Sequence, residues 1–367
     1  MLRYRHLWPI IRLLPPEFAH AAGLNLIQLP IRLVPKPPEY PFTWNGLTFR
    51  NRVGIAAGFD KNAACVAGIE RLGAGFVEVG TILVSPWQGN HVTPRMKRLV
   101  ECRGIWNRLG FTSRGLDVAA RNLASLPRAR RAGMVVACNI GPHPGNLRQA
   151  TGQASALNTV RDEFQTLVNS LHAQTDIFVA NLSSPNTPGL RGLLQSSELA
   201  HAVMLPVRRR IQEMDVETSR SWLTPLLVKL PPEDEHREPW SEDSLKAVLN
   251  PLLETGACEG FVAVNTSTRL AQKLVTNIPQ SELPGGVSGE PLRSEALRIV
   301  SIVRQIIGRE RLLIGCGGVM EPQHARDFLN AGADLVEVYS GMIYAGPELV
   351  GNCVGTMQSK RTEGGQI

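Results

Sequence analysis

The feature that most constrains the fold is a series of eight short apolar runs rich in β-branched residues, each with Gly, Asn, Ser, Thr or Lys at its end. They span residues 53–57, 76–79, 134–139, 177–181, 226–230, 261–265, 312–316 and 335–339. Near-continuous apolar strands are typical of parallel sheets that helices cover on both faces. Helix-like stretches such as 163–171 and 292–307 lie between the runs. Eight strands alternating with helices predict an α/β fold, a (β/α)₈ TIM barrel.

A doubly wound sheet fits less well, because such sheets usually have about five or six strands and no G-x-G-x-x-G sequence follows the first run. The chain has 367 residues, of which 43% are hydrophobic, and this apolar content excludes intrinsic disorder. No apolar run approaches the roughly 18 residues of a membrane span, so we expect a soluble or peripheral protein. The six cysteines form no C-x-x-C pair, and we interpret them as mostly buried, reduced thiols.

Positive charge is concentrated in one part of the chain. The net charge is +7, and residues 95–131 hold ten Lys or Arg against Glu101 and Asp117. A basic patch can bind nucleic acid or an anionic membrane surface, and a solvated arginine-rich face is at least as good an interpretation. Charge alone does not choose among these.

Residues 1–40 form a separate segment, which seven prolines divide into short pieces. Phe18, Ala22, Leu26 and Leu29 recur at helical spacing, and a second apolar cluster lies before Pro15. We expect two short amphipathic helices, which either lie in a membrane interface or pack on the main domain as a cap. The barrel is expected to occupy residues 44–355, followed by a polar tail at 356–367. Two long loops, 83–114 and 267–291, are expected to be functional.

In barrel enzymes the reactive groups lie at the carboxyl ends of the strands. The residues at the predicted strand ends are mainly Asn, Lys, Gly, Ser and Thr, with almost no acid and no histidine. They are Ala57 to Lys61, Gly80, Thr81, Asn139 to Gly141, Asn181 to Thr187, Lys229, Asn265 to Ser267, Gly317, Gly318, Tyr339 and Ser340. This set argues against a metal site and against a Ser-His-Asp hydrolase.

The same residue types suit a flat polar ligand that carries a phosphate. Asn donates and accepts hydrogen bonds, matching the C=O and N–H edge of a pyrimidine or isoalloxazine ring. Gly317-Gly318 and Tyr339-Ser340-Gly341 follow the seventh and eighth runs, where barrels bind phosphate through backbone N–H groups. A phosphate together with a flat polar ring suggests FMN.

Several stretches resemble the class 2, quinone-linked dihydroorotate dehydrogenases, flavin enzymes of pyrimidine biosynthesis. The resemblance runs in order from about residue 16 to 350, and its SSPNTPGLR and AGFDK elements are highly specific. It is carried by residues 51–62 (NRVGIAAGFDKN), 75–81 (GFVEVGT), 107–111 (NRLGF), 181–191 (NLSSPNTPGLR), 285–289 (GGVSG) and 335–341 (LVEVYSG).

The resemblance implies roles residue by residue. Ser184 occupies the position of the catalytic base, Thr187 that of a residue thought to assist proton relay, and Lys61 that of a cation beside substrate and flavin. The implied FMN contacts are Ala57, Gly58, Phe59, Asp60, Lys61, Thr81, Asn139, Asn181, Lys229, Val264, Gly289, Gly318, Tyr339 and Ser340. The implied dihydroorotate contacts are Lys61, Asn107, Arg108, Leu109, Gly110, Phe111, Asn181, Asn186, Asn265 and Thr266. No metal is implied.

The N-terminal segment resembles the helix pair with which class 2 members bind the membrane and form a tunnel for quinone; residues 14–20 (LPPEFAH) carry this likeness. The resemblance therefore implies dihydroorotate and orotate as substrate and product, a membrane quinone as electron acceptor, and an anionic lipid surface as partner. We expect a monomer, attached peripherally to the cytoplasmic side of the cell membrane, and no nucleic acid.

The chain departs from the family pattern at a few positions, among them Val264, Trp87, Trp106 and the Pro142-His143-Pro144 stretch, which replaces a lysine-rich one.

A competing hypothesis is a dihydrouridine synthase, another FMN barrel, which would use the basic residues of 95–131 to bind RNA. Those enzymes use a catalytic Cys, however, and none of the six cysteines lies on the loop after the fourth run. A barrel that has lost catalysis is disfavoured because Lys61, Ser184 and Asn186 are all present.

Overall fold

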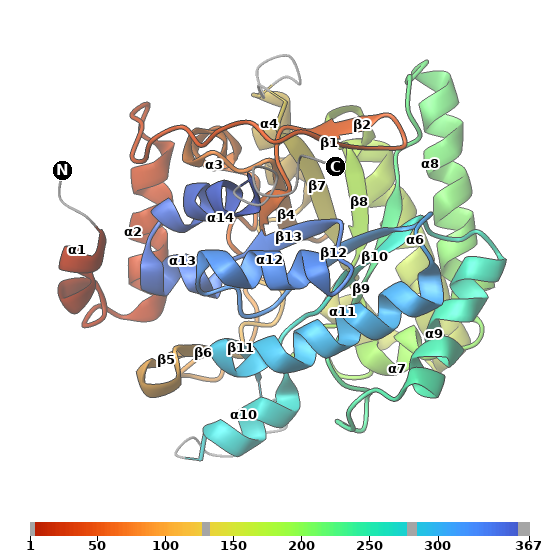
Figure 1. Cartoon of the computed structure of the whole chain (residues 1–367). Coiled ribbons are helices and arrows are strands. Elements are labelled where there is room, and N and C mark those ends of the chain that lie inside the picture. Colours follow the sequence, from red (N-terminus) through yellow and green to blue (C-terminus); the bar gives the residue numbers. More distant parts are fainter. Residues whose placement is uncertain (1–3, 127–132, 277–284, 359–367) are drawn as a thin grey trace.

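The computed structural model describes residues 4–126, 133–276 and 285–358, and a closed barrel of parallel strands lies at its centre (Figure 1). The strands follow one another around the barrel in chain order, and the last strand pairs with the first, which closes the barrel. They are β3 (Val53–Ile55), β4 (Phe76–Ile82), β7 (Val135–Ile140), β8 (Ile177–Ala180), β9 (Leu226–Leu230), β10 (Gly260–Ala263), β12 (Leu312–Cys316) and β13 (Leu335–Val338). The predicted TIM barrel is confirmed, and each predicted run coincides with a strand to within three residues.

The interior of the barrel changes character along the strands. At their amino ends, inward side chains such as Phe76, Leu227 and Leu335 form a buried apolar cluster. The hairpin of β1 (Phe42–Trp44) and β2 (Leu47–Phe49) covers this end, and the ring of Phe49 meets Phe76 edge to face at 5.9 Å. Because side chains two residues apart on a strand point the same way, the residues that follow these apolar ones also face inward. They are the polar groups of the site described below.

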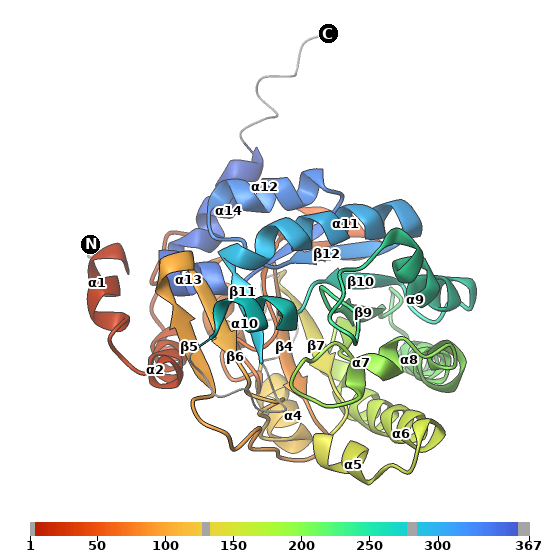
Figure 2. The same cartoon turned by 90° about the horizontal axis from the view of Figure 1, so that it is seen from below.

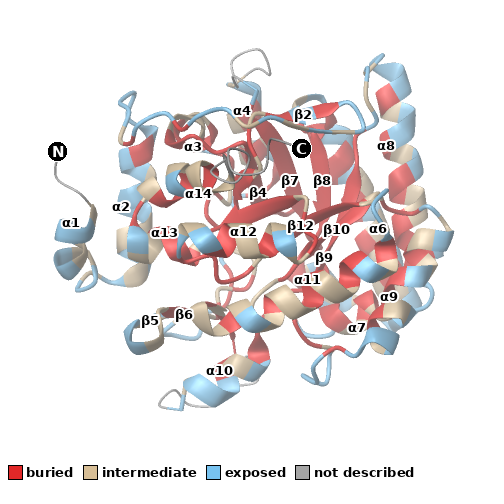
Figure 3. Ribbon diagram, viewed as in Figure 1, coloured by how far each residue is buried: buried red, intermediate tan, exposed pale blue. Residues whose placement is uncertain are grey.

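Helices cover the outside of the barrel with their apolar faces (Figure 3). In α11, for example, Ala296, Ile299, Val300 and Val303 recur at helical spacing and are buried, as the sequence pattern predicts. The covering helices are α3 (Val66–Leu72), α4 (Leu116–Ala124), α6 (Gln153–Leu171), α8 (Leu205–Glu217), α9 (Glu242–Glu254), α11 (Arg293–Ile307), α12 (Pro322–Asn330) and α14 (Glu348–Gln358). Residues 356–358, expected to be tail, complete α14, and 359–367 lie outside the described residues.

The two segments expected as long loops contain regular structure. β5 (Met96–Leu99) and β6 (Gly104–Asn107) form an antiparallel pair, and β11 (Gly286–Gly289) joins it on the other side of β6. Figure 2 shows this small sheet beside α10 (Thr268–Leu274) and near α13 (Ser340–Ala345). The loop prediction was therefore wrong for these residues. The pairing of β6 with β11 has no local pattern, because most of the barrel sequence separates the two strands.

The N-terminal segment consists of the two predicted helices, α1 (Tyr4–Ile11) and α2 (Pro16–Gln28), at one side of the barrel (Figure 1). The Tyr4 hydroxyl donates to the carbonyl of Ile343 at 2.7 Å, and α2 lies against α3 and β5. Several large apolar side chains of this segment remain exposed, including Leu13 (79%), Ile10 (65%) and Phe18 (61%). In the described part of the chain, no helix has both the length and the apolarity that crossing a bilayer requires.

Part of the basic segment makes contacts within the protein. Arg95 pairs with Glu17 of α2, and Arg98 donates to the carbonyl of Leu14 at 2.6 Å. Arg103 pairs with Glu321 at 2.9 Å. These arginines hold the small sheet against α2 and the barrel, which gives them a structural role; residues 127–132 of the segment lie outside the described residues.

Candidate active site

A cavity of about 470 Å³ lies between the carboxyl ends of the barrel strands and helices α1 and α2. Its walls combine polar groups from the strand ends with apolar groups from the helices, including Leu7, Ile11, Ala19 and Ile27. Most predicted site residues line it. They are Ala57, Gly58, Phe59, Lys61, Thr81, Asn107, Leu109, Gly110, Phe111, Asn181, Ser184, Asn186, Lys229, Val264, Asn265, Thr266, Gly318, Tyr339 and Ser340.

Five predicted site residues do not line the cavity. The carboxylate of Asp60 accepts the backbone N–H groups of Ala64 and Cys65 at 2.9 and 2.7 Å, at the start of α3. Arg108 points away, donating to the carbonyl of Pro94 at 3.0 Å. Asn139 and Thr187 are buried behind lining residues, and Gly289 lies against the backbone of Arg103.

The sequence departures also lie mostly outside the cavity. His143 is buried and its ring meets Trp87 edge to face at 5.0 Å, while its backbone N–H donates to Glu163 at 2.6 Å. Trp106 is buried with Ala271 and Val287 beside the small sheet. Only Val264 of this group lines the cavity.

An amide and hydroxyl network fixes the polar wall. The Thr81 hydroxyl donates to Asn139 Oδ1 at 2.6 Å, and Asn181 Nδ2 donates to both Thr81 Oγ1 and Asn139 Oδ1 at 3.1 Å. Asn181 Oδ1 accepts the Ser183 hydroxyl at 2.9 Å, and that hydroxyl accepts from Asn265 Nδ2, also at 2.9 Å. Buried polar groups that satisfy one another in this way hold a single orientation. Asn139 therefore acts on the cavity through Asn181 and Thr81.

Ser184 lies on the loop after β8 and is 5% exposed. Its hydroxyl oxygen accepts the backbone N–H of Asn186 at 3.3 Å. The side-chain oxygens of Asn186 and Thr187 are buried and have no hydrogen-bond partner among the described residues. This loop thus carries three buried oxygens with hydrogen-bonding capacity to spare, two of them on residues that line the cavity.

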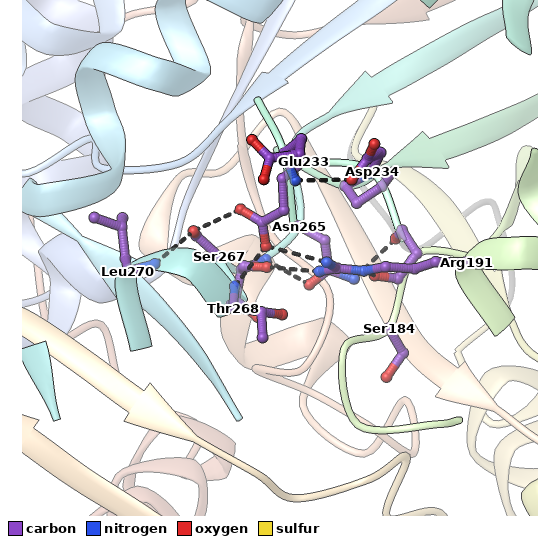
Figure 4. Close-up of polar contacts among 12 residues, drawn as sticks. Ser184, Arg191, Glu233, Asp234, Asn265, Ser267, Thr268 and Leu270 are labelled. Carbon is purple, nitrogen blue, oxygen red and sulfur yellow. Dashed lines mark hydrogen bonds and ion pairs between the residues drawn. The ribbon is translucent and has the colours of Figure 1, made fainter. Parts of the chain in front are cut away.

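A buried ion pair joins the loop that carries Ser184 to the loop that carries Asn265 (Figure 4). The Arg191 guanidinium donates to the Ser183 carbonyl (3.2 Å), to Glu233 (3.0 Å) and to the Thr266 carbonyl (3.2 Å). The Glu233 carboxylate also accepts the Ser267 hydroxyl at 2.7 Å and the Thr268 N–H at 2.6 Å. Arg191 and Glu233 together therefore position the loop of Ser184 relative to that of Asn265 and Thr266.

Lys61 is one of three lysine or arginine residues that line the cavity, together with Arg98 and Lys229. Its ammonium donates to the Thr112 hydroxyl at 2.6 Å, and burial lowers its pKa to about 8. His20 of α2 lies nearby, with its ring 5.5 Å from Phe59 and 6.2 Å from Tyr339. Burial, and then the charge of Lys61, lower the pKa of His20 to about 4. At neutral pH this part of the cavity therefore has a mostly charged lysine and an uncharged histidine.

Two acids at the base of the cavity were missed by sequence reasoning. Lys229 Nζ contacts Glu78 at 2.9 Å and Glu337 at 3.7 Å. Burial would lower the pKa of Lys229, but the two carboxylates raise it overall. The available signal was a glutamate inside each of two otherwise apolar runs, FVEVG and LVEVY. Each glutamate lies two residues beyond an apolar side chain that points into the barrel, so it points inward as well.

Comparison with known proteins adds the family. The family model for dihydroorotate dehydrogenase matches residues 42–360. A curated relative from Bordetella avium, named dihydroorotate dehydrogenase (quinone), is 34% identical over 357 residues, covering 96% of each chain. A relative of the same name from Anaeromyxobacter is 36% identical and covers 94% of this chain and 90% of its own.

Solved structures agree with this match. The crystal structure of a dihydroorotate dehydrogenase from Eimeria tenella in complex with ferulenol is similar with a TM-score of 0.80 and 30% identity. The match covers 95% of this chain and 92% of that one. The ligand-free structure of the Eimeria protein gives a TM-score of 0.79.

We predict that Glu233→Gln lowers the free energy of unfolding by roughly 3–5 kcal/mol, because it leaves the buried Arg191 cation without its carboxylate. Urea denaturation measures this change. Glu242→Gln, which breaks the exposed ion pair with Lys246 on α9, is the matched control and should leave the midpoint nearly unchanged. Equal, small effects of the two variants would contradict the positioning role of the Arg191–Glu233 pair.

Proposed function

The chain belongs to the dihydroorotate dehydrogenase family, and from this premise we propose that it oxidises dihydroorotate to orotate in the synthesis of UMP. The proposal includes FMN as the hydride acceptor and a membrane quinone as the final electron acceptor. One observation carries it: Lys61, Asn181, Ser184, Asn186 and Asn265 line a single cavity that continues between α1 and α2. A polar reaction chamber thereby adjoins an apolar passage toward the surface.

The donor set of the cavity fits FMN. The Asn181 amide, the Thr81 hydroxyl and the Lys229 ammonium offer donors and acceptors for the edge of a flat ring. The backbone of Gly317-Gly318 and the Ser288 and Ser340 hydroxyls, which lie 2.9 Å apart, offer donors for a phosphate. When bound, FMN supplies the acceptor for two electrons and a hydride.

The proposed chemistry assigns Ser184 the role of base. Oxidation breaks the C5–H bond, whose electrons form the C5=C6 double bond as the hydrogen on C6 leaves as hydride. The C5 proton passes to the Ser184 hydroxyl oxygen as that hydroxyl gives up its own proton to the next carrier. Serine is a poor base in water, so it acts here in a buried site, with the unpartnered Thr187 hydroxyl as the proposed next proton carrier.

Substrate orientation is assigned to the amides and to Lys61. Asn107, Asn186 and Asn265 present hydrogen-bonding groups to the pyrimidine edge, which fixes C5 relative to Ser184. Lys61 stabilises the substrate carboxylate and the negative charge that develops during oxidation. Since its pKa is about 8, this charge is present at neutral pH and is lost as the pH rises through 8. Affinity for the anionic substrate should weaken over the same interval.

The N-terminal segment is proposed to attach the enzyme to the membrane. Ile10, Leu13 and Phe18 present apolar surface that no described part of the protein covers, while Leu7, Ile11 and Leu14 line the cavity. A quinone could therefore enter from the lipid between α1 and α2. We assign the protein as a monomer bound peripherally to an anionic lipid surface on the cytoplasmic side of the cell membrane.

We predict that Ser184→Ala keeps bound FMN but lowers turnover at neutral pH by about 10²–10⁴-fold, the range typical for loss of a general base. Stopped-flow reduction of the flavin by dihydroorotate measures this rate. Ser197→Ala, at an exposed serine outside the cavity, is the control and should keep full activity. Full activity of Ser184→Ala would rule out the assigned base.

We also predict that deletion of residues 1–38 spares flavin reduction by dihydroorotate but removes efficient reduction of quinone. The polar chamber is built from strand ends, whereas the passage needs α1 and α2. Steady-state kinetics with a long-chain quinone in vesicles measures the second half-reaction. As a control, the double variant Leu13→Glu and Phe18→Glu should lose vesicle binding yet retain reduction of a short-chain quinone. Unchanged quinone kinetics after the deletion would refute the passage.

A further inference from the structure

Three ionisable side chains meet inside the barrel at the base of the cavity: Glu78 from β4, Lys229 from β9 and Glu337 from β13. Their side chains are between 0 and 5% exposed. They continue the inward-facing rows that start at Phe76, Leu227 and Leu335, so the fold places them in one layer. Two carboxyl groups thus share one ammonium group away from solvent.

This layer cannot hold two negative charges easily. A buried charge without a partner is very costly, and two carboxylates close together cannot both ionise without one pKa rising strongly. With one lysine present, the layer is neutral only when one of the two acids keeps its proton. The adjacent strand does not supply a second cation, because Cys316, opposite Glu337 in the β12–β13 register, is a half-buried thiol whose pKa is raised by desolvation.

The contacts show which acid keeps the proton. Both Glu78 oxygens accept from Lys229, at 3.0 and 2.9 Å, and Glu78 also accepts the Asn139 amide. Both Glu337 oxygens are buried, and no nitrogen donor of the described residues is hydrogen-bonded to them, whereas the Glu78 carboxylate and the Cys316 thiol lie within hydrogen-bonding reach of this carboxyl group. Burial would raise the pKa of Glu78, but Lys229 lowers it below its ordinary value. Burial, and then the charge of Glu78, raise the pKa of Glu337 well above its ordinary value.

The remaining groups around Glu337 do not change this balance. β3, the other strand beside β13, contributes only Val53, Gly54 and Ile55. Tyr339, at the end of β13, has its pKa raised by burial and stays neutral. Glu337 itself lines the cavity, so its carboxyl group can reach a ligand bound there as well as Glu78.

We propose that Glu337 is a neutral carboxylic acid at neutral pH and that its O–H group donates a hydrogen bond to the ring bound in the cavity. The identity of the ring as a flavin rests on the proposed function; the protonation state of Glu337 does not. A neutral acid at this position would offer the bound ring a donor without adding negative charge to the cavity, which would suit a ring that gains negative charge on reduction. An ionised Glu337 would instead repel that charge.

Infrared spectroscopy tests the protonation state directly, on protein purified at pH 7 and measured with and without FMN. We expect the carbonyl stretching band of a protonated carboxylic acid, sensitive to exchange into D₂O, that disappears in Glu337→Gln. Asp60 and Glu163 are also acids with raised pKa values, so the difference between wild type and variant makes the assignment. A spectrum of Glu337→Gln identical to that of the wild type in this region would overturn the proposal.

Glu78→Gln provides the matched second variant. It leaves Glu337 as the only carboxyl group of the layer that can pair with Lys229, so Glu337 should ionise and the same band should vanish. Persistence of the band in a folded Glu78→Gln protein would contradict the shared-proton account. Because the band is also expected without FMN, a protein that binds no flavin would refute the proposed function and leave this test intact.

Titration with FMN tests the donor role. Glu337→Gln replaces a neutral donor with a neutral donor, so the FMN dissociation constant should change less than about threefold. Glu337→Leu removes the donor and should weaken binding by about 3–10-fold, the loss of one hydrogen bond. Tightening of FMN binding by more than tenfold in Glu337→Gln would show that the wild-type group is charged, and would overturn the proposal.

Discussion

The ion pair between Arg191 and Glu233 is the contact on which the arrangement of the site depends. It joins the loop after β8, which carries Ser184, to the loop after β10, which carries Asn265 and Thr266, through hydrogen bonds to backbone carbonyls and N–H groups. Such a buried pair contributes little net stability compared with apolar packing, because desolvating the charges is costly. Its value lies in geometry: a planar guanidinium fixes three acceptors on different segments at once.

Burial also determines which ionisable groups of the cavity carry charge at neutral pH. Burial lowers the pKa of Lys61 to about 8, so that this lysine is mostly charged at neutral pH. At the base, Lys229 is held charged by Glu78, and the second acid is inferred to be neutral. The helices add an apolar wall and an uncharged His20. An anionic substrate would thus meet Lys61, whose charge changes near neutral pH, and Arg98 also lines the cavity, while the base of the cavity stays near zero net charge.

Much of the fold could be predicted because its signal is local. Each of the eight apolar runs is a barrel strand. Lys61, Asn181 and Ser184, which were expected at the carboxyl ends of strands, line one cavity. The pairing of β6 with β11 in the small sheet escaped prediction because the two strands lie far apart in the chain. Arg108 was assigned with its neighbours Asn107 and Leu109, yet it points away from the cavity because successive residues do not share one direction. Glu337 was missed because an apolar run does not reveal which of its positions face inward.

The central claim is that the cavity oxidises dihydroorotate with a bound flavin, and anaerobic mixing of the purified protein with dihydroorotate tests it most directly. The visible spectrum should show bleaching of the flavin band, and the band should return on addition of a short-chain quinone but not of fumarate or NAD. A bound flavin that stays oxidised in the presence of dihydroorotate would contradict the assigned substrate and leave only the barrel and its cofactor site.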